Sequence, residues 1–236
     1  MHRKIKELKR IARGNLQGRY MEFIRVLVFC NIITTLLEMP FSMMTNDIQF
    51  STQNMIYYIA ITLINIASVV LIGGQYRMHL CAARTKEVHP SDLFYPVKYH
   101  ANRYIFTEFI LFGFSIIAMI PMFIGIALIF TQEALGYYIG AVFLLLISLL
   151  GIIYLSLTFD LVYFVLNDHE DLGMMTALKY TKELITTHRK RYLYLLLSFL
   201  PMLFLVALSF GIANFWVQPY MLQTTTLFYL DIKNEL

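Results

Sequence analysis

The chain has 236 residues, of which 58% are hydrophobic and 14% charged, with a formal net charge of +4. Soluble globular domains carry roughly a quarter charged residues, so this composition excludes the soluble classes and places the chain in lipid. The sequence contains no Gly-rich phosphate loop, Ser-His-Asp order or zincin pattern, so we predict that the protein is not an enzyme and has no catalytic residue or cofactor.

A basic stretch, 4–19, opens the chain. Its apolar residues Ile5, Leu8, Ala12 and Leu16 recur every three or four positions. This pattern predicts an amphipathic helix that lies flat on the cytoplasmic membrane surface, with cations around an apolar stripe. A secretory signal also has a basic region before an apolar one, but the long apolar run and the lack of a small-residue cleavage site predict an uncleaved anchor.

Apolar runs without interior Lys or Arg follow at 26–44, 55–76, 105–130, 134–166 and 192–230. The first four have the length of roughly 20 residues or more that crosses about 30 Å of hydrocarbon. The fifth can form two short spans that turn near 211–214, or one span with an interfacial tail. We favour two, which predicts an all-α transmembrane bundle of six spans, with five as the alternative.

The cations are distributed unevenly along the chain. Lys and Arg concentrate in 1–25, 77–103 and 167–191, whereas the connections 45–54 and 131–133 carry none. Because cationic loops stay in the cytoplasm, the pattern predicts a multi-pass plasma-membrane protein with a cytoplasmic N-terminus. Six spans place the C-terminus in the cytoplasm as well, and five spans place it outside.

The pairs Arg19-Tyr20, Arg103-Tyr104 and Arg191-Tyr192 recur at near-equal spacing, and each pair opens an apolar run. We interpret them as marks of an internal repeat. The alternative is that any membrane loop contains such residues, because Tyr is favoured at interfaces and Arg snorkels.

The repeat divides a single integral-membrane domain, 1–236, into units of about 1–80, 81–166 and 167–236. Each unit is predicted to be a cytoplasmic amphipathic helix followed by a transmembrane hairpin. The second and third amphipathic stretches are 91–102 and 172–188. Their predicted apolar faces consist of Leu93, Val97 and Ala101 and of Leu172, Met175, Leu178 and Ile185.

Two sets of residues are predicted to contact the membrane surface. Cations that reach anionic headgroups each contribute about 1 kcal/mol, and aromatic residues anchor helices at the interface. The cations are Lys4, Lys6, Lys9, Arg10, Arg13, Arg19, Arg103 and Arg191, and the anchors are Tyr20, Tyr104, Tyr192 and Trp216.

Four polar residues inside the spans are candidates for function, because burying them in lipid is costly. Asn31 and Asn65 fall near the middle of adjacent spans, where a mutual hydrogen bond would contribute less than about 2 kcal/mol to the first hairpin. The same amides could line a solute path. Glu38 and Asp160 are carboxylates near span ends, and the alternative for them is an interfacial position satisfied by water or backbone.

Small residues, histidines and cysteines complete the inventory. Gly73-Gly74 and the pair Gly136 and Gly140 permit close helix approach. The six histidines match no zinc spacing, so we predict no metal site. Cys30 and Cys81 fall at different depths and are expected to be reduced thiols.

The chain resembles, over nearly its whole length, the uncharacterised integral-membrane family of Gram-positive bacteria known as domain of unknown function nine-seven-five. The segment 185–189 and the pair Leu200-Pro201 depart from the family's pattern. The resemblance implies a polytopic bacterial membrane protein and supplies no activity. The residues that carry it are 7–13, Leu16, Gly18, Tyr20, 91–94, 196–199, Gly211, Trp216, Pro219-Tyr220, Thr224-Thr225 and Phe228-Tyr229.

Two functions fit these patterns. The preferred one is a membrane scaffold or accessory subunit whose basic amphipathic helices engage anionic lipid, a membrane-protein partner or a second copy of the chain; no feature predicts nucleic-acid binding. The alternative is a small-solute or lipid transporter with a path near Asn31 and Asn65. The parallel orientation of the repeats, which lacks the inverted symmetry of many carriers, favours the first.

Overall fold

A computed structural model describes residues 2–43, 52–85, 88–131 and 134–236, and this part of the chain is helical without strands. The predicted cation-free connections 45–54 and 131–133 fall mostly outside these residues. The elements are α1 (Ile5–Leu16), α2 (Tyr20–Ser42), α3 (Thr52–Arg84), the 3-10 helix η1 (Pro90–Phe94), α4 (Tyr95–Tyr99), α5 (Ala101–Thr131), α6 (Leu135–Phe159), α7 (Val162–Asp168), α8 (Met174–Thr186), α9 (Arg189–Leu197), α10 (Leu200–Leu208) and α11 (Asn214–Ile232).

Within the described residues, five helical segments are long and apolar enough to cross a membrane. The five segments are Tyr20–Ser42, Asn54–Arg84, Ala101–Phe130, Leu135–Asp168 and Arg189–Leu208. This count agrees with the alternative of five spans and does not confirm the sixth, because α11 is not among the segments.

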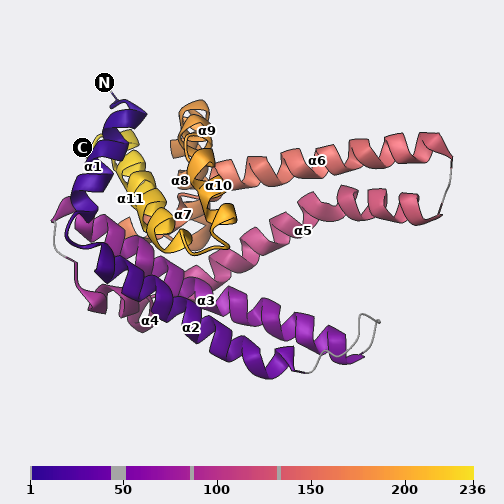
Figure 1. Cartoon of the computed structure of the whole chain (residues 1–236), viewed down its shortest axis with the longest axis horizontal. Coiled ribbons are helices and arrows are strands. Elements are labelled where there is room, and N and C mark those ends of the chain that lie inside the picture. The colour runs from indigo at the N-terminus through magenta and orange to yellow at the C-terminus, as the bar shows by residue number, and fades with distance from the viewer. Residues whose placement is uncertain (1, 44–51, 86–87, 132–133) are drawn as a thin grey trace.

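The long helices form two hairpins that diverge from a common base (Figure 1). One consists of α2 and α3, and the other of α5 and α6. At the base lie α1, α7 to α11 and both chain termini, which are close together. Most of the side chains that are fully buried belong to this base, so the core sits there and not between the hairpin tips.

Two left-handed turns set the path of the chain at the base. Gly18, with φ of +80°, lets α2 leave α1 at an angle. Phe210 (φ 50°) and Gly211 (φ 90°) reverse the chain after α10, and glycine adopts this conformation without the penalty of a Cβ. α11 therefore runs back towards the start of α9.

α1 packs along α11, and the four residues of its predicted stripe are all buried: Leu8, Ala12 and Leu16 are 0% exposed, and Ile5 is 8% exposed. The stripe predicted from the sequence is thus the buried face of the helix. Its expected insertion into lipid is wrong, because the stripe is covered by protein.

The other two amphipathic stretches differ from prediction in detail. Residues 91–102 are divided among η1, α4 and the start of α5: Pro96 lacks the N–H group that a continuous helix needs, and His100 leaves the helical conformation. Val97 of the predicted apolar face is exposed. In α8, Leu178 and Ile185 are buried as expected, whereas Met175 is exposed.

Close helix approach occurs at one of the two predicted glycine pairs. A Cβ on Gly74 would lie 2.0 Å from the carbonyl oxygen of Leu93, and one on Gly73 would lie 2.3 Å from the ring of Tyr104. Nothing lies within 4 Å of the corresponding position on Gly136 or Gly140. Only the pair in α3 is therefore used for packing in the described part of the chain.

Candidate functional site

A polar cleft of about 520 Å³ lies between the first hairpin and the C-terminal helices. α2 and α3 form one wall, and α9, α10 and α11 form the other, and Asp160 after α6 also lines the cleft. Its polar lining comes from ten residues of distant parts of the chain: Asn31 and Thr34 of α2, Asn65, Ser68, Gln75 and Tyr76 of α3, Asp160 after α6, and Asn214, Gln218 and Thr225 of α11.

The cleft contains both asparagines that the sequence singled out, but they do not bind each other. Asn31 donates to the carbonyl oxygen of Leu27 (2.9 Å). Asn65 donates to the carbonyl oxygen of Ile61 (2.9 Å) and to Oε1 of Glu38 (3.0 Å). The predicted amide pair is wrong, because each side chain turns back to its own helix; α2 and α3 are instead joined by Asn65 with Glu38.

Several polar groups in the cleft have unused hydrogen-bonding capacity. The side-chain oxygen of Asn31 and the NH₂ group of Gln218 have no hydrogen-bond partner among the described residues, whereas Gln75 is hydrogen-bonded to the thiol of Cys30. Gln218 accepts from Asn214 through its oxygen (3.0 Å). An amide carries both donors and an acceptor, so the free atoms of Asn31 and Gln218 can bind water or a polar ligand.

Asp160 lies at the junction of this cleft with a second cavity. The second cavity has a volume of about 270 Å³, and Glu108, Tyr163 and Ser156 also line it. Asp160 accepts a hydrogen bond from the hydroxyl of Tyr192, and Glu108 accepts one from that of Tyr163. The sequence identified Asp160 but not Glu108 as a candidate.

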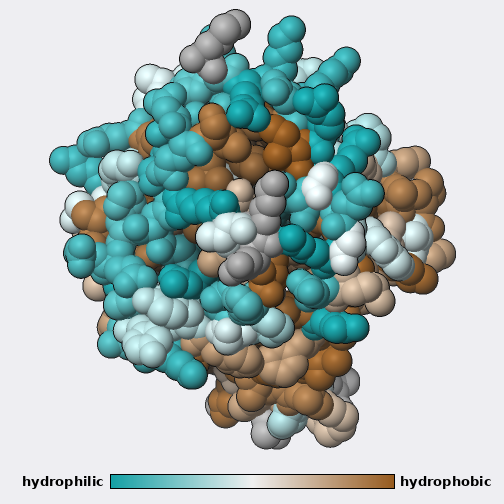
Figure 2. Space-filling model, turned by 90° about the vertical axis from the view of Figure 1, so that its left-hand side faces the viewer, coloured by the Kyte–Doolittle hydropathy of each residue, from teal (hydrophilic) through white to brown (hydrophobic). Residues whose placement is uncertain are grey.

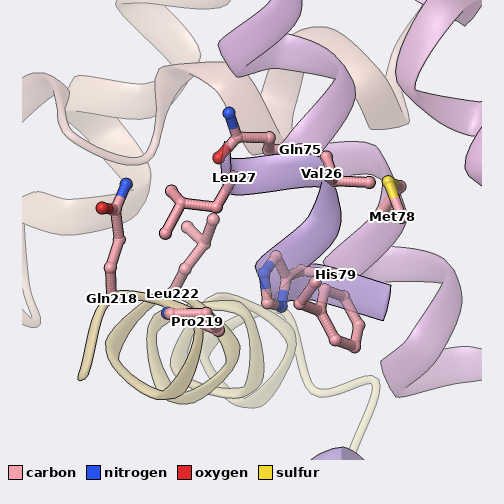
Figure 3. A pocket seen from close by; sticks show the side chains of 9 residues that line it. Val26, Leu27, Gln75, Met78, His79, Gln218, Pro219 and Leu222 are labelled. Atoms are coloured by element: carbon pink, nitrogen blue, oxygen red, sulfur yellow. The ribbon is translucent and has the colours of Figure 1, made fainter. Parts of the chain in front are cut away.

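A small pocket of about 10 Å³ adjoins the cleft and shares Gln75 and Gln218 with it (Figure 3). On its far side His79 stacks on Phe23, with ring centroids 4.3 Å apart. Nδ1 of His79 lies 2.6 Å from the side-chain oxygen of Gln223. This buried contact ties α3 to α11 directly behind the cleft.

Ion pairs hold the last turn of α11 at the base. Asp231, 5% exposed, pairs with Arg191 (2.6 Å) and accepts from the backbone N–H of Arg3 (3.0 Å). His2 also contacts Asp231. The N-terminus, the start of α9 and the end of α11 therefore lie side by side.

A second ion cluster follows at Asp168, which pairs with Arg84 (2.6 Å) and Lys233 (2.9 Å). Glu235 pairs with both cations as well. Burial favours a higher pKa for Glu235, but its bonds to Lys233 and Arg84 outweigh burial and lower the pKa. For Lys233 burial favours a lower pKa, and its bonds to Glu235 and Asp168 raise it.

The eight cations predicted at the membrane surface divide into two groups. Lys4, just before α1, and Lys6, Arg10 and Arg13 on α1 are exposed, and Nε of Arg13 donates to the hydroxyl of Tyr220 (3.2 Å). Lys9, in contrast, donates to the carbonyl of Ser198 (2.8 Å), and burial together with the charge of Arg13 lowers its pKa.

The two later junction arginines bind the protein itself. Arg103 donates to the carbonyls of His169 and Leu172, both at 2.7 Å. Arg191 pairs with Asp231. Both were predicted to bind lipid headgroups, and in the structure both instead join separate segments of the chain. Arg19 is half-buried and also has an interaction partner.

The predicted aromatic anchors also divide. Tyr104 and Tyr192 are 2% and 0% exposed and lie inside the core, so their assignment to the lipid interface is wrong. Both were assigned from the interface preference of Tyr, which does not distinguish lipid from a protein neighbour. Trp216 is exposed and Tyr20 half-buried, and their contact with the interface stays a prediction.

Sequence reasoning missed most of the polar lining of the cleft. Gln75, Gln218 and Asn214 lie in or beside apolar runs but were not singled out. The signal that could have found them is the density of amide and hydroxyl residues in α11, including Gln218 and Gln223, which is unusual for a helix that faces lipid.

Fold and site together define a helical protein with apolar helices of membrane-spanning length and a polar cleft among them. The chain belongs to the family described as "Protein of unknown function (DUF975)", which it matches over residues 1–235. No curated protein and no solved structure matches it.

Proposed function

We propose that this protein binds a small polar solute in the cleft between its first hairpin and α11, as a step in moving the solute across the membrane. The observation that carries the proposal is the 520 Å³ cleft with its ten polar lining residues. Ligand pockets are concave, with a few convergent polar groups on an apolar frame, and here the frame is supplied by residues such as Leu27 and Ile72.

The topology that we propose has six spans, with α11 as the sixth, in a threefold arrangement of helix and hairpin. α11 follows a tight reversal after α10 and ends beside the start of α9, where Asp231 meets Arg191. Its 19 residues extend about 28 Å at 1.5 Å each, close to the thickness of the hydrocarbon. Because other helices cover it, α11 can cross while carrying polar residues.

The proposed arrangement has both termini on one side of the membrane, and the distribution of cations supports the cytoplasm of a plasma-membrane protein as that side. The contacts of His2 and Arg3 with Asp231 support a shared side. We test it with Leu236→Cys and Lys4→Cys in a chain that carries Cys30→Ala and Cys81→Ala. An impermeant thiol reagent added to intact cells should label neither, and both after lysis; labelling of position 236 alone in intact cells would refute six spans.

The solute site is tested by thermal unfolding of the purified protein in lipid nanodiscs against a panel of polar metabolites. A solute that binds the folded protein and is present at 100 times its Kd raises the free energy of unfolding by about 2.7 kcal/mol. Asn31→Leu and Gln218→Leu should remove the shift, because they delete amides in the cleft. Asn102→Leu is the matched control, since Asn102 is exposed and lines none of the described cavities. Equal shifts in all variants, or no shift with any solute, would contradict the proposal.

A second candidate is the scaffold or accessory subunit that engages anionic lipid, a membrane-protein partner or another copy of the chain. Its supporting observation is the exposed row of Lys4, just before α1, and Lys6, Arg10 and Arg13 on α1. The face that contains both termini is mostly hydrophilic, with hydrophobic residues at its lower and right-hand edges and in its upper middle (Figure 2). With the apolar stripe of α1 buried, headgroup binding would depend on these cations alone.

Binding of the purified protein to a partner or to vesicles distinguishes the two candidates. Charge reversal of Lys4, Lys6 and Arg10 should abolish partner or lipid capture under the scaffold hypothesis and leave solute binding unchanged. Loss of solute stabilisation in Asn31→Leu, with capture intact, supports the solute site. The side chains of these three cations make no hydrogen bond or ion pair with the described residues, so their substitution changes the charge of the surface without removing a bond of the fold.

A further inference from the structure

The charges around the cleft are all of one sign. Asp160 lines both the cleft and the second cavity, and Glu108 lines the second cavity. Glu38 binds Asn65, whose side chain lines the cleft. No Lys, Arg or His of the described residues lines either space. The region is therefore electronegative.

Asp160 has no positively charged partner within the part of the chain that the structure describes. Its one side-chain hydrogen bond there comes from the neutral hydroxyl of Tyr192. This distinguishes it from Asp168 and Asp231, which also lie at helix ends but pair with Arg84 and Arg191. A carboxylate held among membrane helices is costly without a compensating positive charge.

The size of the cleft bears on what can supply that charge. A volume of 520 Å³ is many times the roughly 10–15 Å³ that a cavity needs to hold one water molecule, so the cleft has room for an organic molecule. Among the described residues, no group of three His, Cys, Asp or Glu side chains is placed to hold a metal ion. The amide oxygens of Gln75 and Gln218, which line the same cleft as Asp160, can accept from N–H or O–H groups of a ligand.

We infer that the solute of the cleft is a small organic cation, with an amine or quaternary ammonium group that pairs with the carboxylate of Asp160. This inference rests on the proposed solute site and names its substrate class. The positive group lies against Asp160 at the junction of the two cavities, and the rest of the molecule extends towards the amides of α11.

The test compares cations with uncharged molecules of the same shape. Purified protein in nanodiscs is titrated with choline and ethanolamine and with their neutral analogues dimethylbutanol and ethylene glycol, and unfolding midpoints are measured. At least one cation should bind ten times or more tightly than its neutral analogue in the wild type. Asp160→Asn keeps an acceptor for Tyr192 but removes the charge, and it should abolish the difference.

Glu183→Gln is the matched control, because Glu183 is exposed on α8 and lines neither cavity; it should behave as the wild type. If Asp160→Asn does not fold, the comparison of each cation with its neutral analogue in the wild type still tests whether the cleft prefers a cation. Equal binding of both members of every pair overturns the inference. A carboxylic-acid infrared band assigned to Asp160 at neutral pH also overturns it, because a proton then replaces the cation.

The results separate this inference from the proposed function. Stabilisation by a neutral or anionic solute that disappears in Gln218→Leu keeps the solute site and refutes the cationic class. No stabilisation by a solute of any charge refutes both.

Discussion

Gly74→Ala tests the contact on which the base of the molecule depends. The new Cβ would lie 2.0 Å from the carbonyl oxygen of Leu93 and within 2.8 Å of its Cα, whereas ordinary contact begins at 3.4 Å. Both atoms belong to the backbone of η1, so no side-chain rotation relieves the overlap, and η1 must move by well over an ångström. We expect the free energy of unfolding to fall by about 3 kcal/mol, which is the upper end of the range for a substitution that overpacks a core.

That loss corresponds to a fall in the unfolding midpoint of roughly 6–12 °C for a chain of this size. It can be measured by thermal unfolding in nanodiscs. The matched control is Gly140→Ala in α6, where nothing lies within 4 Å and the gain in helix propensity is about 0.5–1 kcal/mol. A Gly74→Ala protein as stable as the Gly140→Ala protein would refute the packing of α3 on η1.

Three further predictions concern α11 and the segment after it. Asp231→Asn should lower the free energy of unfolding by about 3 kcal/mol, because it leaves the guanidinium of Arg191 without its counter-charge. Unfolding in denaturant measures this loss, and Asp171→Asn at an exposed position is the control that should show none. Gln223→Leu should lower the free energy of unfolding by about 1–3 kcal/mol, because Nδ1 of His79 loses its only described hydrogen-bond partner from a side chain. Gln17→Leu, at an exposed position, is its control. Glu235 has a lowered pKa in the folded protein, so its contribution to stability is present above its ordinary pKa of 4.5 and is lost as the pH falls through the lower folded value. Unfolding midpoints measured from neutral pH into that acidic range should therefore fall less steeply in Glu235→Gln than in the wild type, and identical slopes would contradict the ion cluster.

The sequence predicted the helices and their buried faces better than the partners of those faces. The stripe of α1, from Ile5 to Leu16, was identified residue by residue because its period is that of a helix. The period says which side of a helix is apolar and nothing about what covers that side. Lipid and α11 are equally good partners for Leu8, and only the tertiary arrangement distinguishes them.

The candidate site was predicted in part for a related reason. Asn31, Asn65 and Asp160 were found because polar residues in apolar runs are conspicuous, and all three line the cleft. Their partners could not be predicted, because the choice between a neighbouring helix and the preceding turn depends on side-chain geometry. Asn31 illustrates this, since its amide binds the carbonyl of Leu27 one turn earlier.

In the six-span arrangement that we propose, shielding from lipid accounts for the concentration of polar residues in α11. Helices on the outside of a membrane bundle must be apolar, but a helix surrounded by its neighbours meets no such requirement. In α11 the run from Gln223 to Ile232 is buried, and it includes three threonines and Asp231. The polar residues that keep α11 below the hydropathy of the five candidate spans therefore include Asn214 and Gln218, which line the cleft.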